Sequence, residues 1–311
     1  MRRAAIIFGI LTVGIVSTVF VSEAQDTGQP AQQTPPASQA ATAPAPVAPP
    51  KAKRPPQAKT QQEFDAYKVA IAVTDPAAME KAAIDFAAKF PDSEIRILLY
   101  QSSMRLYQTA NNGEKTETMG RKVLGLDPDN PEALIAVAGV IAERTRDTDI
   151  DKDQQFGEAI TMAQKSTQTV DTDLGMQAGT PQERIDAAKS LLRSQAYSIL
   201  GTIEFKKEDY PAAQENLQKS IDIYPSDPSA VDILRLALAL DKQQKYPEAL
   251  KAANRAVELT QDNTPIGTPA RRERDRLQQL TGAAAPAQSP TPPPTPAQPQ
   301  TPPQTQTPPK N

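Results

Sequence analysis

An internal repeat constrains this 311-residue chain more than any other feature. The stretch ILGTIEFKKEDYPAAQENLQKSIDIYP, residues 199–225, aligns with RLALALDKQQKYPEALKAANRAVELTQ, residues 235–261, at a shift of 36 positions. Apolar residues recur at helical spacing on both sides of a shared Tyr-Pro step, and small residues recur where two helices would cross closely. Strand-type clusters between Gly-rich turns are missing. The sequence therefore predicts an all-α fold made of repeated helix–turn–helix units.

Proline marks the ends of the folded region. Of the 31 prolines, 20 lie in residues 26–60 and 282–311, two stretches with almost no large apolar residues. Such segments cannot bury enough surface to offset the entropy of ordering, so we expect disordered arms. Runs such as PTPPPTP at 290–296 favour a flexible spacer over a ligand motif. We predict a disordered linker at 25–61, a helical repeat domain at 62–281 and a disordered tail at 282–311.

The repeat resembles the tetratricopeptide repeat family, whose unit of about 34 residues has a Leu-Gly pair, an aromatic residue at the turn, an alanine opening the second helix and a late proline. The unit from 194 to 227 carries Tyr197, Leu200, Gly201, Tyr210, Ala213 and Pro225. The unit from 230 to 263 carries Leu236, Ala237, Tyr246 and Ala249, without the glycine and the late proline. This resemblance implies a right-handed solenoid in which Gly201 and Ala213 face each other.

Looser copies of the unit lie upstream. Tyr107 and Pro128 fit one copy, and Ala138 and Ala159 fit the next. Several helix starts are predicted where a capping side chain precedes a proline. These pairs are Asp75-Pro76, Asn130-Pro131, Thr180-Pro181, Asp227-Pro228 and Thr268-Pro269. The last segment, PARRERDRLQQL, suits a terminal capping helix with Leu277 and Leu280 on its apolar side.

The N-terminus has the pattern of an export signal. MRRAAIIFGILTVGIVSTVFVSEAQ has a charged start, an apolar run and small residues at Ser22 and Ala24. We predict a signal peptide at 1–24, cleaved after Ala24. The alternative is an uncleaved membrane anchor, since the apolar run of 18 residues is about the minimum that spans a bilayer. Both alternatives place the body of the protein outside the cytoplasm, either periplasmic or secreted, or membrane-anchored facing outside.

Composition argues against catalysis. The chain has no cysteine and no histidine, so thiolate chemistry, disulfides and imidazole bases or ligands are excluded. No Gly-rich phosphate loop or nucleophile elbow is present. We therefore predict no enzymatic activity and no cofactor. The formal charge of −3 gives no electrostatic case for nucleic acid, and the basic run KAKRPPQAK at 51–59 favours a solubilising linker over an anion-binding segment.

An acidic stretch, DTDIDKDQQFGE at 147–158, has the carboxylate spacing of a calcium loop. Asp147, Asp149, Asp151 and Glu158 fall at the ligand offsets, but Lys152 stands where the loop requires glycine. Ala159 aligns with the opening of a second helix, which would place Glu158 on that helix. The stretch is interpreted as an acidic loop insertion between a helix ending near Arg144 and one starting near Gln155.

The family resemblance also implies a groove along the inner faces of the first helices, where related proteins hold peptides. The implied groove residues are Ser198, Thr202, Phe205, Lys206, Leu234, Leu238, Asp241 and Lys242. Chaperone-binding members use a Lys and Asn clamp for a terminal carboxylate. Ser198 and Thr202 stand where that clamp would begin, so this activity does not transfer.

These observations support an exported scaffold or adaptor that binds a protein or peptide partner in the cell envelope. The alternative function is a membrane-anchored structural tether whose N-terminal helix is uncleaved. Only this alternative involves a membrane, and neither involves nucleic acid.

Overall fold

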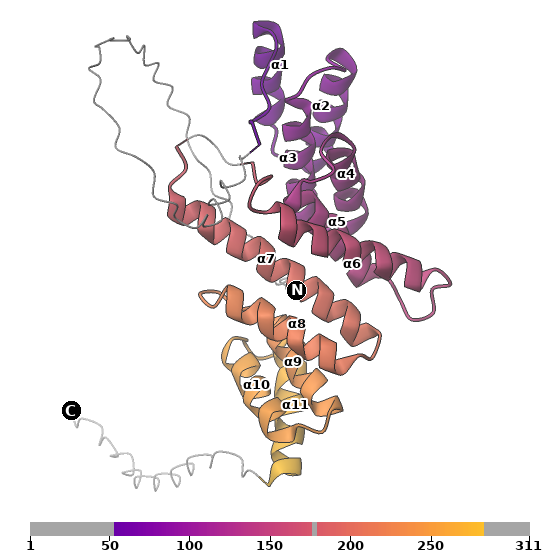
Figure 1. Ribbon diagram of the computed structural model, residues 1–311, viewed down its shortest axis with the longest axis vertical. Helices are drawn as coiled ribbons and strands as arrows, with labels where there is room; N and C mark the ends of the chain where they lie inside the picture. Colours follow the sequence, from indigo (N-terminus) through magenta and orange to yellow (C-terminus); the bar gives the residue numbers. More distant parts are fainter. Residues whose placement is uncertain (1–52, 176–178, 283–311) are drawn as a thin grey trace, which may run out of the picture.

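The computed structural model describes residues 53–175 and 179–282, and the predicted leader and most of both predicted arms lie outside these residues. Within the two described stretches the chain is all-α and contains no strand (Figure 1). The helices are α1 (Gln61–Ile71), α2 (Pro76–Lys89), α3 (Arg96–Thr109), α4 (Gly113–Leu126), α5 (Pro131–Arg144), α6 (Lys152–Thr169), α7 (Gln182–Lys206), α8 (Tyr210–Ile223), α9 (Ala230–Lys242), α10 (Tyr246–Glu258) and α11 (Gly267–Thr281). The predicted fold class is confirmed.

The helices form hairpins that stack along one long axis (Figure 1). The pairs α1/α2, α3/α4, α5/α6, α7/α8 and α9/α10 follow one another, and α11 packs on α10 at the end. First helices of neighbouring hairpins also touch, as α5 touches α7 and α7 touches α9. Second helices of neighbouring hairpins pack far less closely within the described residues. The first helices therefore form the inner layer of a helical solenoid.

Local signals set several of the helix starts. Asp75 and Asn130 cap α2 and α5 by accepting hydrogen bonds from Ala78 N and Ala133 N, as predicted, with proline in the first turn. The three other predicted starts are shifted along the chain. The helix α7 has Pro181 at its N-cap position, α9 is capped by Ser229 rather than Asp227, and α11 already begins at Gly267.

Three hairpin turns share one geometry. Asn111, Glu208 and Gln244 have φ of 54°, 63° and 60° and follow α3, α7 and α9. At each turn the next residue donates its N–H to a carbonyl five residues back, as Asp209 N does to Glu204 O at 2.9 Å. This is the Schellman motif, which satisfies free carbonyls at the end of a helix. Glu208 and Gln244 are 36 positions apart, so the repeat in sequence is a repeat of this turn.

The repeat-defining residues occupy the hairpin interior. Leu200, Gly201, Ala213, Leu236, Ala237 and Ala249 are buried, Tyr197, Tyr210 and Tyr246 are half-buried, and Pro225 is exposed after α8. The nearest neighbour of Gly201 differs from the prediction. A Cβ at this position would lie 2.6 Å from Leu217 Cγ and 3.1 Å from Leu217 N, so Leu217, and not Ala213, meets the glycine. Both Ala213 and Leu217 are buried on α8, one turn apart.

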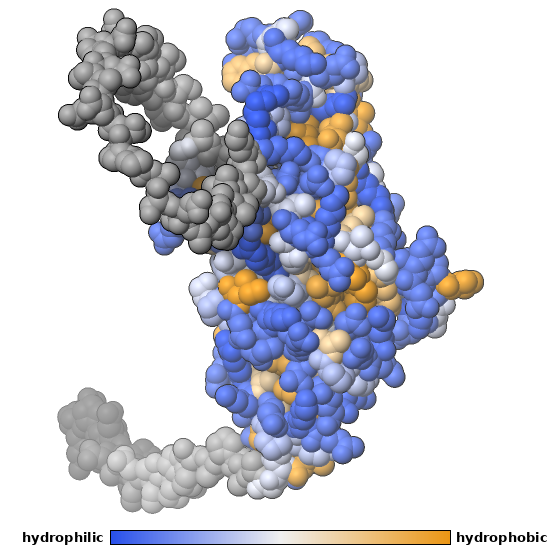
Figure 2. All heavy atoms as spheres, in the orientation of Figure 1, coloured by the Kyte–Doolittle hydropathy of each residue, from blue (hydrophilic) through white to orange (hydrophobic). Residues whose placement is uncertain are grey.

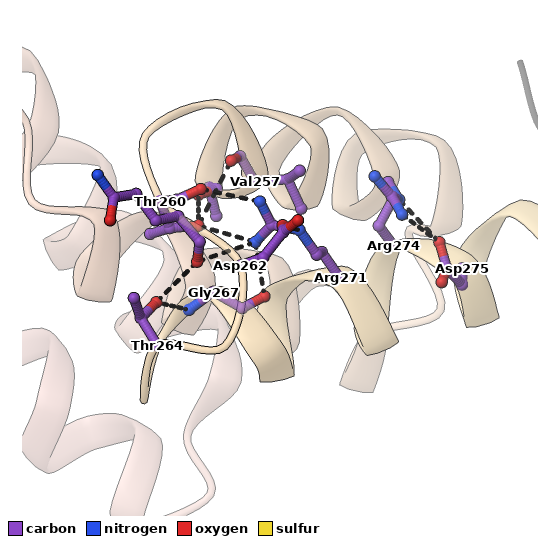
Figure 3. A network of polar contacts seen from close by, with 10 residues as sticks. Val257, Thr260, Asp262, Thr264, Gly267, Arg271, Arg274 and Asp275 are labelled. Carbon is purple, nitrogen blue, oxygen red and sulfur yellow. Dashed lines mark hydrogen bonds and ion pairs between the residues drawn. The ribbon is translucent and has the colours of Figure 1, made fainter. Parts of the chain in front are cut away.

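The last helix is tied to the end of α10 by Arg271 (Figure 3). Its guanidinium donates to Thr260 O at 2.9 Å and to Gly267 O at 3.0 Å, and it pairs with Asp262. Gly267 is required here because a Cβ would lie 2.1 Å from Gln261 O. Leu277 is fully buried against α10, whereas Leu280 is 53% exposed. The predicted capping helix therefore buries only part of its apolar side.

We expect Gly201→Ala to lower the free energy of unfolding by about 1–3 kcal/mol, because the added Cβ overlaps a buried leucine. Gly157→Ala on α6 is the matched control, since a Cβ there meets nothing within 4 Å. Alanine is the better helix former, so the control is expected to gain about 0.5–1 kcal/mol. Urea denaturation followed by circular dichroism measures both changes. Equal effects at the two glycines would contradict the close crossing.

Candidate binding surface

The predicted groove residues of α7 face its neighbours on both sides. Ser198 donates to Asp232 Oδ1 on α9 at 2.7 Å, and Thr202 is buried and accepts from Arg235 Nη1 at 2.9 Å. Phe205 is half-buried, with its ring centroid 5.6 Å from that of Tyr210 in an edge-on arrangement. The polar groups of α7 in this region thus satisfy contacts within the fold.

Lys206 stabilises the end of another helix. Its Nζ donates to the carbonyl oxygens of Ala142, Glu143 and Thr145, at 2.6, 3.1 and 3.1 Å, where α5 ends. A cation at a helix C-terminus satisfies free carbonyls and interacts favourably with the helix dipole. Burial lowers the pKa of Lys206, and Glu143 partly opposes this effect. Lys206 therefore joins the third hairpin to the fourth.

The predicted groove residues of α9 have unequal exposure. Leu234 is buried and Leu238 is half-buried against the C-terminal core. Asp241 pairs with Arg276 of α11 at 2.5 Å, and Lys242 is exposed at the end of the helix. Of the eight predicted groove residues, Phe205, Leu238 and Lys242 thus keep accessible surface without a charged partner among the described residues.

Ion pairs connect the first helices along the inner layer. Arg105 on α3 holds Glu132 on α5 through two bonds of 2.5 Å, and Arg235 on α9 reaches Glu143 at 2.8 Å. Asp241 and Arg276 continue the series to α11. Each of these pairs joins opposite charges, so these side chains neutralise one another within the fold. Sequence reasoning missed the pairs because their partners lie 27 to 92 positions apart.

Asp232 is the centre of a buried polar cluster. The carboxylate is 2% exposed and accepts from Ser198 on α7 and from Ser220 on α8 at 2.7 and 2.9 Å. Ser194 donates to Ser220 O at 2.9 Å and extends the cluster. Burial raises the pKa of Asp232, although the two hydroxyl donors oppose the shift. One carboxylate thus holds three helices together.

The acidic stretch is a loop only in its first part. Residues 147–151 lie between α5 and α6, whereas residues 152–158 belong to α6, which begins at Lys152 and not near Gln155 as predicted. Asp149 accepts from Arg146 N at 2.8 Å, Asp151 is at the N-cap position of α6, and Asp147 is exposed. Glu158 lies on α6, as the alignment of Ala159 indicated, and pairs with Arg121 of α4 at 2.7 Å. The described part of the chain brings together no group of three acidic side chains that could hold a metal ion.

Within the basic run, residues 53–59 are described, and they lie against the solenoid. Lys53 donates to Asp127 and lies 3.6 Å from Asp173, while Arg54 pairs with Glu94. Burial lowers the pKa of Lys53, but the bond to Asp127 and the charges of both aspartates outweigh this effect and raise it. The helices among the described residues include none with the length and apolar character needed to cross a membrane.

Comparison with known proteins identifies no family. No protein-family model matches the chain, and no curated protein matches it. Among solved structures the chain is similar to "Assembly Chaperone of RpL4 (Acl4) (Residues 1-338)", at 13% identity and a TM-score of 0.38. The match covers 71% of this chain and 98% of that chain. A likeness this distant carries no argument about function.

We expect Asp232→Asn to change how stability depends on pH. The raised pKa means that folding takes up a proton between the unfolded and folded pKa values, so this group's contribution to stability falls as pH rises through that window. The amide at position 232 cannot titrate, so the free energy of unfolding of the variant relative to the parent should increase from pH 4 to pH 7. Urea denaturation at each pH measures this difference. Asp227→Asn, at an exposed position, is the control and should leave the difference constant. A constant difference for Asp232→Asn would contradict this assignment.

Proposed function

We propose that the protein is a non-catalytic scaffold of the tetratricopeptide-repeat type that binds a protein or peptide partner outside the cytoplasm. The observation that carries the proposal is the stacking of hairpins with their first helices on one side. A stack of this kind presents one extended surface built from many short helices, which is how solenoid proteins bind large partners. Fold alone does not fix function, so the argument depends on what this surface offers.

The inner layer offers apolar contacts beside neutralised charges. Phe205 and Leu238 are both half-buried and pack against the same C-terminal core, and Lys242 lies one turn beyond Leu238. The surrounding Arg235 and Asp241 are already paired within the fold. Recognition at this surface therefore depends on apolar contact and shape more than on charge. Of the eight predicted groove residues, we therefore propose that Phe205, Leu238 and Lys242 contact the partner.

The predicted export signal supports the proposed role in the cell envelope. The charged start, the apolar run and the small residues before Gln25 are the features of a secretory signal. A chain without cysteine forms no disulfide after export, so its stability comes from non-covalent contacts such as the packing of its helices. The tether is the alternative, and it requires that the N-terminal segment stays attached.

We expect a photo-crosslinking residue at position 242 to capture a discrete partner in cells that contain the full-length protein. Position 251 is the matched control, because Lys251 is also exposed but lies on the second helix of the same hairpin. Leu238→Glu should remove the adduct at 242, since a charge replaces apolar contact. Equal adducts at 242 and 251, or an adduct that survives Leu238→Glu, would contradict a binding surface on the inner layer.

We expect the mature protein purified from its native host to begin at Gln25, as read by mass spectrometry of the intact protein. Cell fractionation should place this form in the periplasm or medium. A protein that still carries residues 1–24 and sediments with membranes would support the tether instead. A cytoplasmic full-length protein would contradict both.

A further inference from the structure

A short segment before α1 lies along one edge of the solenoid. Residues 53–59 touch the loops that precede α3, α5 and α7, which separate four consecutive hairpins. In Figure 1 this segment is the dark indigo stretch that leads from the start of α1 toward the loop before α7. One extended segment therefore spans the N-terminal half of the stack.

Two carboxylates converge on the first residue of this segment. Lys53 Nζ donates to Asp127 and lies 3.6 Å from Asp173 Oδ1. The aspartate side chains are only 10% and 18% exposed, so water screens them little. Two such carboxylates repel each other unless a cation lies between them. This pair is therefore suited to receive an ammonium or guanidinium group.

The remaining contacts of the edge bind the side chain of Arg54 and the main chain of the extended segment. Arg54 Nη2 donates to both oxygens of Glu94, at 2.8 and 2.9 Å, and Gln57 N donates to the same carboxylate at 3.2 Å. Lys53 N donates to Thr172 O at 3.0 Å. The prolines that follow, Pro55 and Pro56, disfavour helix and keep the segment extended. Main-chain bonds combined with charged side chains are typical of peptide recognition.

The basic side chains are held loosely. The side chain of Lys53 is 49% exposed and that of Arg54 is 60% exposed, so both can leave the edge without opening the apolar core. The Arg54–Glu94 pair is exposed on both sides, and such pairs contribute little stability. The segment stays in place because Thr60 is the N-cap of α1, which keeps the basic residues at a high effective concentration. A contact of this strength can be exchanged for a competing ligand.

We propose that this acidic edge, formed by Glu94, Asp127, Asp173 and the carbonyl of Thr172, is a docking site for an extended basic peptide segment of a partner protein, and that residues 53–59 are its intramolecular occupant. The site is separate from the inner layer and does not depend on the function proposed for that layer. A ligand needs adjacent basic residues followed by a stretch that cannot form helix. The chain's own segment restrains access until such a ligand competes with it.

The test uses a fluorescent peptide, KAKRPPQAKT, which has the sequence of residues 51–60. It is titrated by anisotropy into the full chain and into the double variant Lys53→Ala/Arg54→Ala, which releases the edge. We expect at least tenfold tighter binding to the double variant at low salt, and weaker binding as salt increases. A peptide with Gln in place of its first two lysines and its arginine should not bind.

A second variant tests the site itself. Glu94→Gln/Asp127→Asn/Asp173→Asn, added to the released variant, should abolish binding while circular dichroism confirms folding. Equal binding to the parent and the released variant, or binding that survives neutralisation of the three acids, would overturn the proposal. If the released variant does not fold, the test is the rate at which a lysine-acetylating reagent modifies Lys53 in the parent chain. Excess peptide must then increase the acetylated fraction found by mass spectrometry, and an unchanged fraction rejects the docking site.

Discussion

The whole stack depends on burial of the apolar face of each hairpin against its neighbours. A two-helix unit cannot bury this face alone, so each hairpin is stable only with hairpins beside it. The helix α5 shows the constraint most clearly, because residues 133–138 are all buried. Its side chains contribute to two clusters, one shared with α3 and α4 and one shared with α6 and α7. The apolar surface in Figure 2 is correspondingly broken into patches between polar side chains.

Close approach between the helices of a hairpin makes this burial possible. Gly201 lets α7 and α8 meet with Leu217 between them, and Gly120 does the same for α4, where a Cβ would lie 2.6 Å from Val137 of α5. The glycines serve different interfaces, the first within a hairpin and the second between hairpins. Small residues thus set the spacing of the stack at points where larger side chains would separate the helices.

Polar contacts fix the position of each hairpin relative to the next, in a stack that apolar packing stabilises. Lys206 on α7 reaches the carboxyl end of α5, and Asp232 accepts from two helices at once. Neither contact extends the apolar core, but each fixes how one hairpin sits on the next. The segment at 53–59 also touches several hairpins of the N-terminal half, where α1 packs mainly on α2 and α3, but its basic side chains are exposed. Lys206 and Asp232 are held within the fold by these contacts and are not available to a ligand. The apolar part of the inner layer and the acidic edge, whose occupant is exposed and exchangeable, remain for recognition.

The sequence by itself determined the fold class, the hairpin period and the positions of Leu200, Gly201 and Ala213 in the hairpin interior. These follow from helical spacing and turn chemistry, which act over a few residues. Asp75 and Asn130 were predictable as caps for the same reason. The cap of α9 is local as well, because Ser229 Oγ accepts from Asp232 N three residues later, whereas the bonds of the Asp232 carboxylate to α7 and α8 form only in the tertiary structure.

Tertiary structure also decided the roles of the candidate site residues. Lys206 and Asp241 have the same identity whether they face a ligand or a neighbouring helix, and only the folded chain shows that they bind α5 and α11. The basic run at 51–59 is similar: composition describes a solvated linker, but Asp127 and Asp173 lie 74 and 120 positions away from Lys53 and meet it only after the hairpins stack. Local patterns are read over one or two turns of chain, whereas charge partners are chosen by the distances that packing creates.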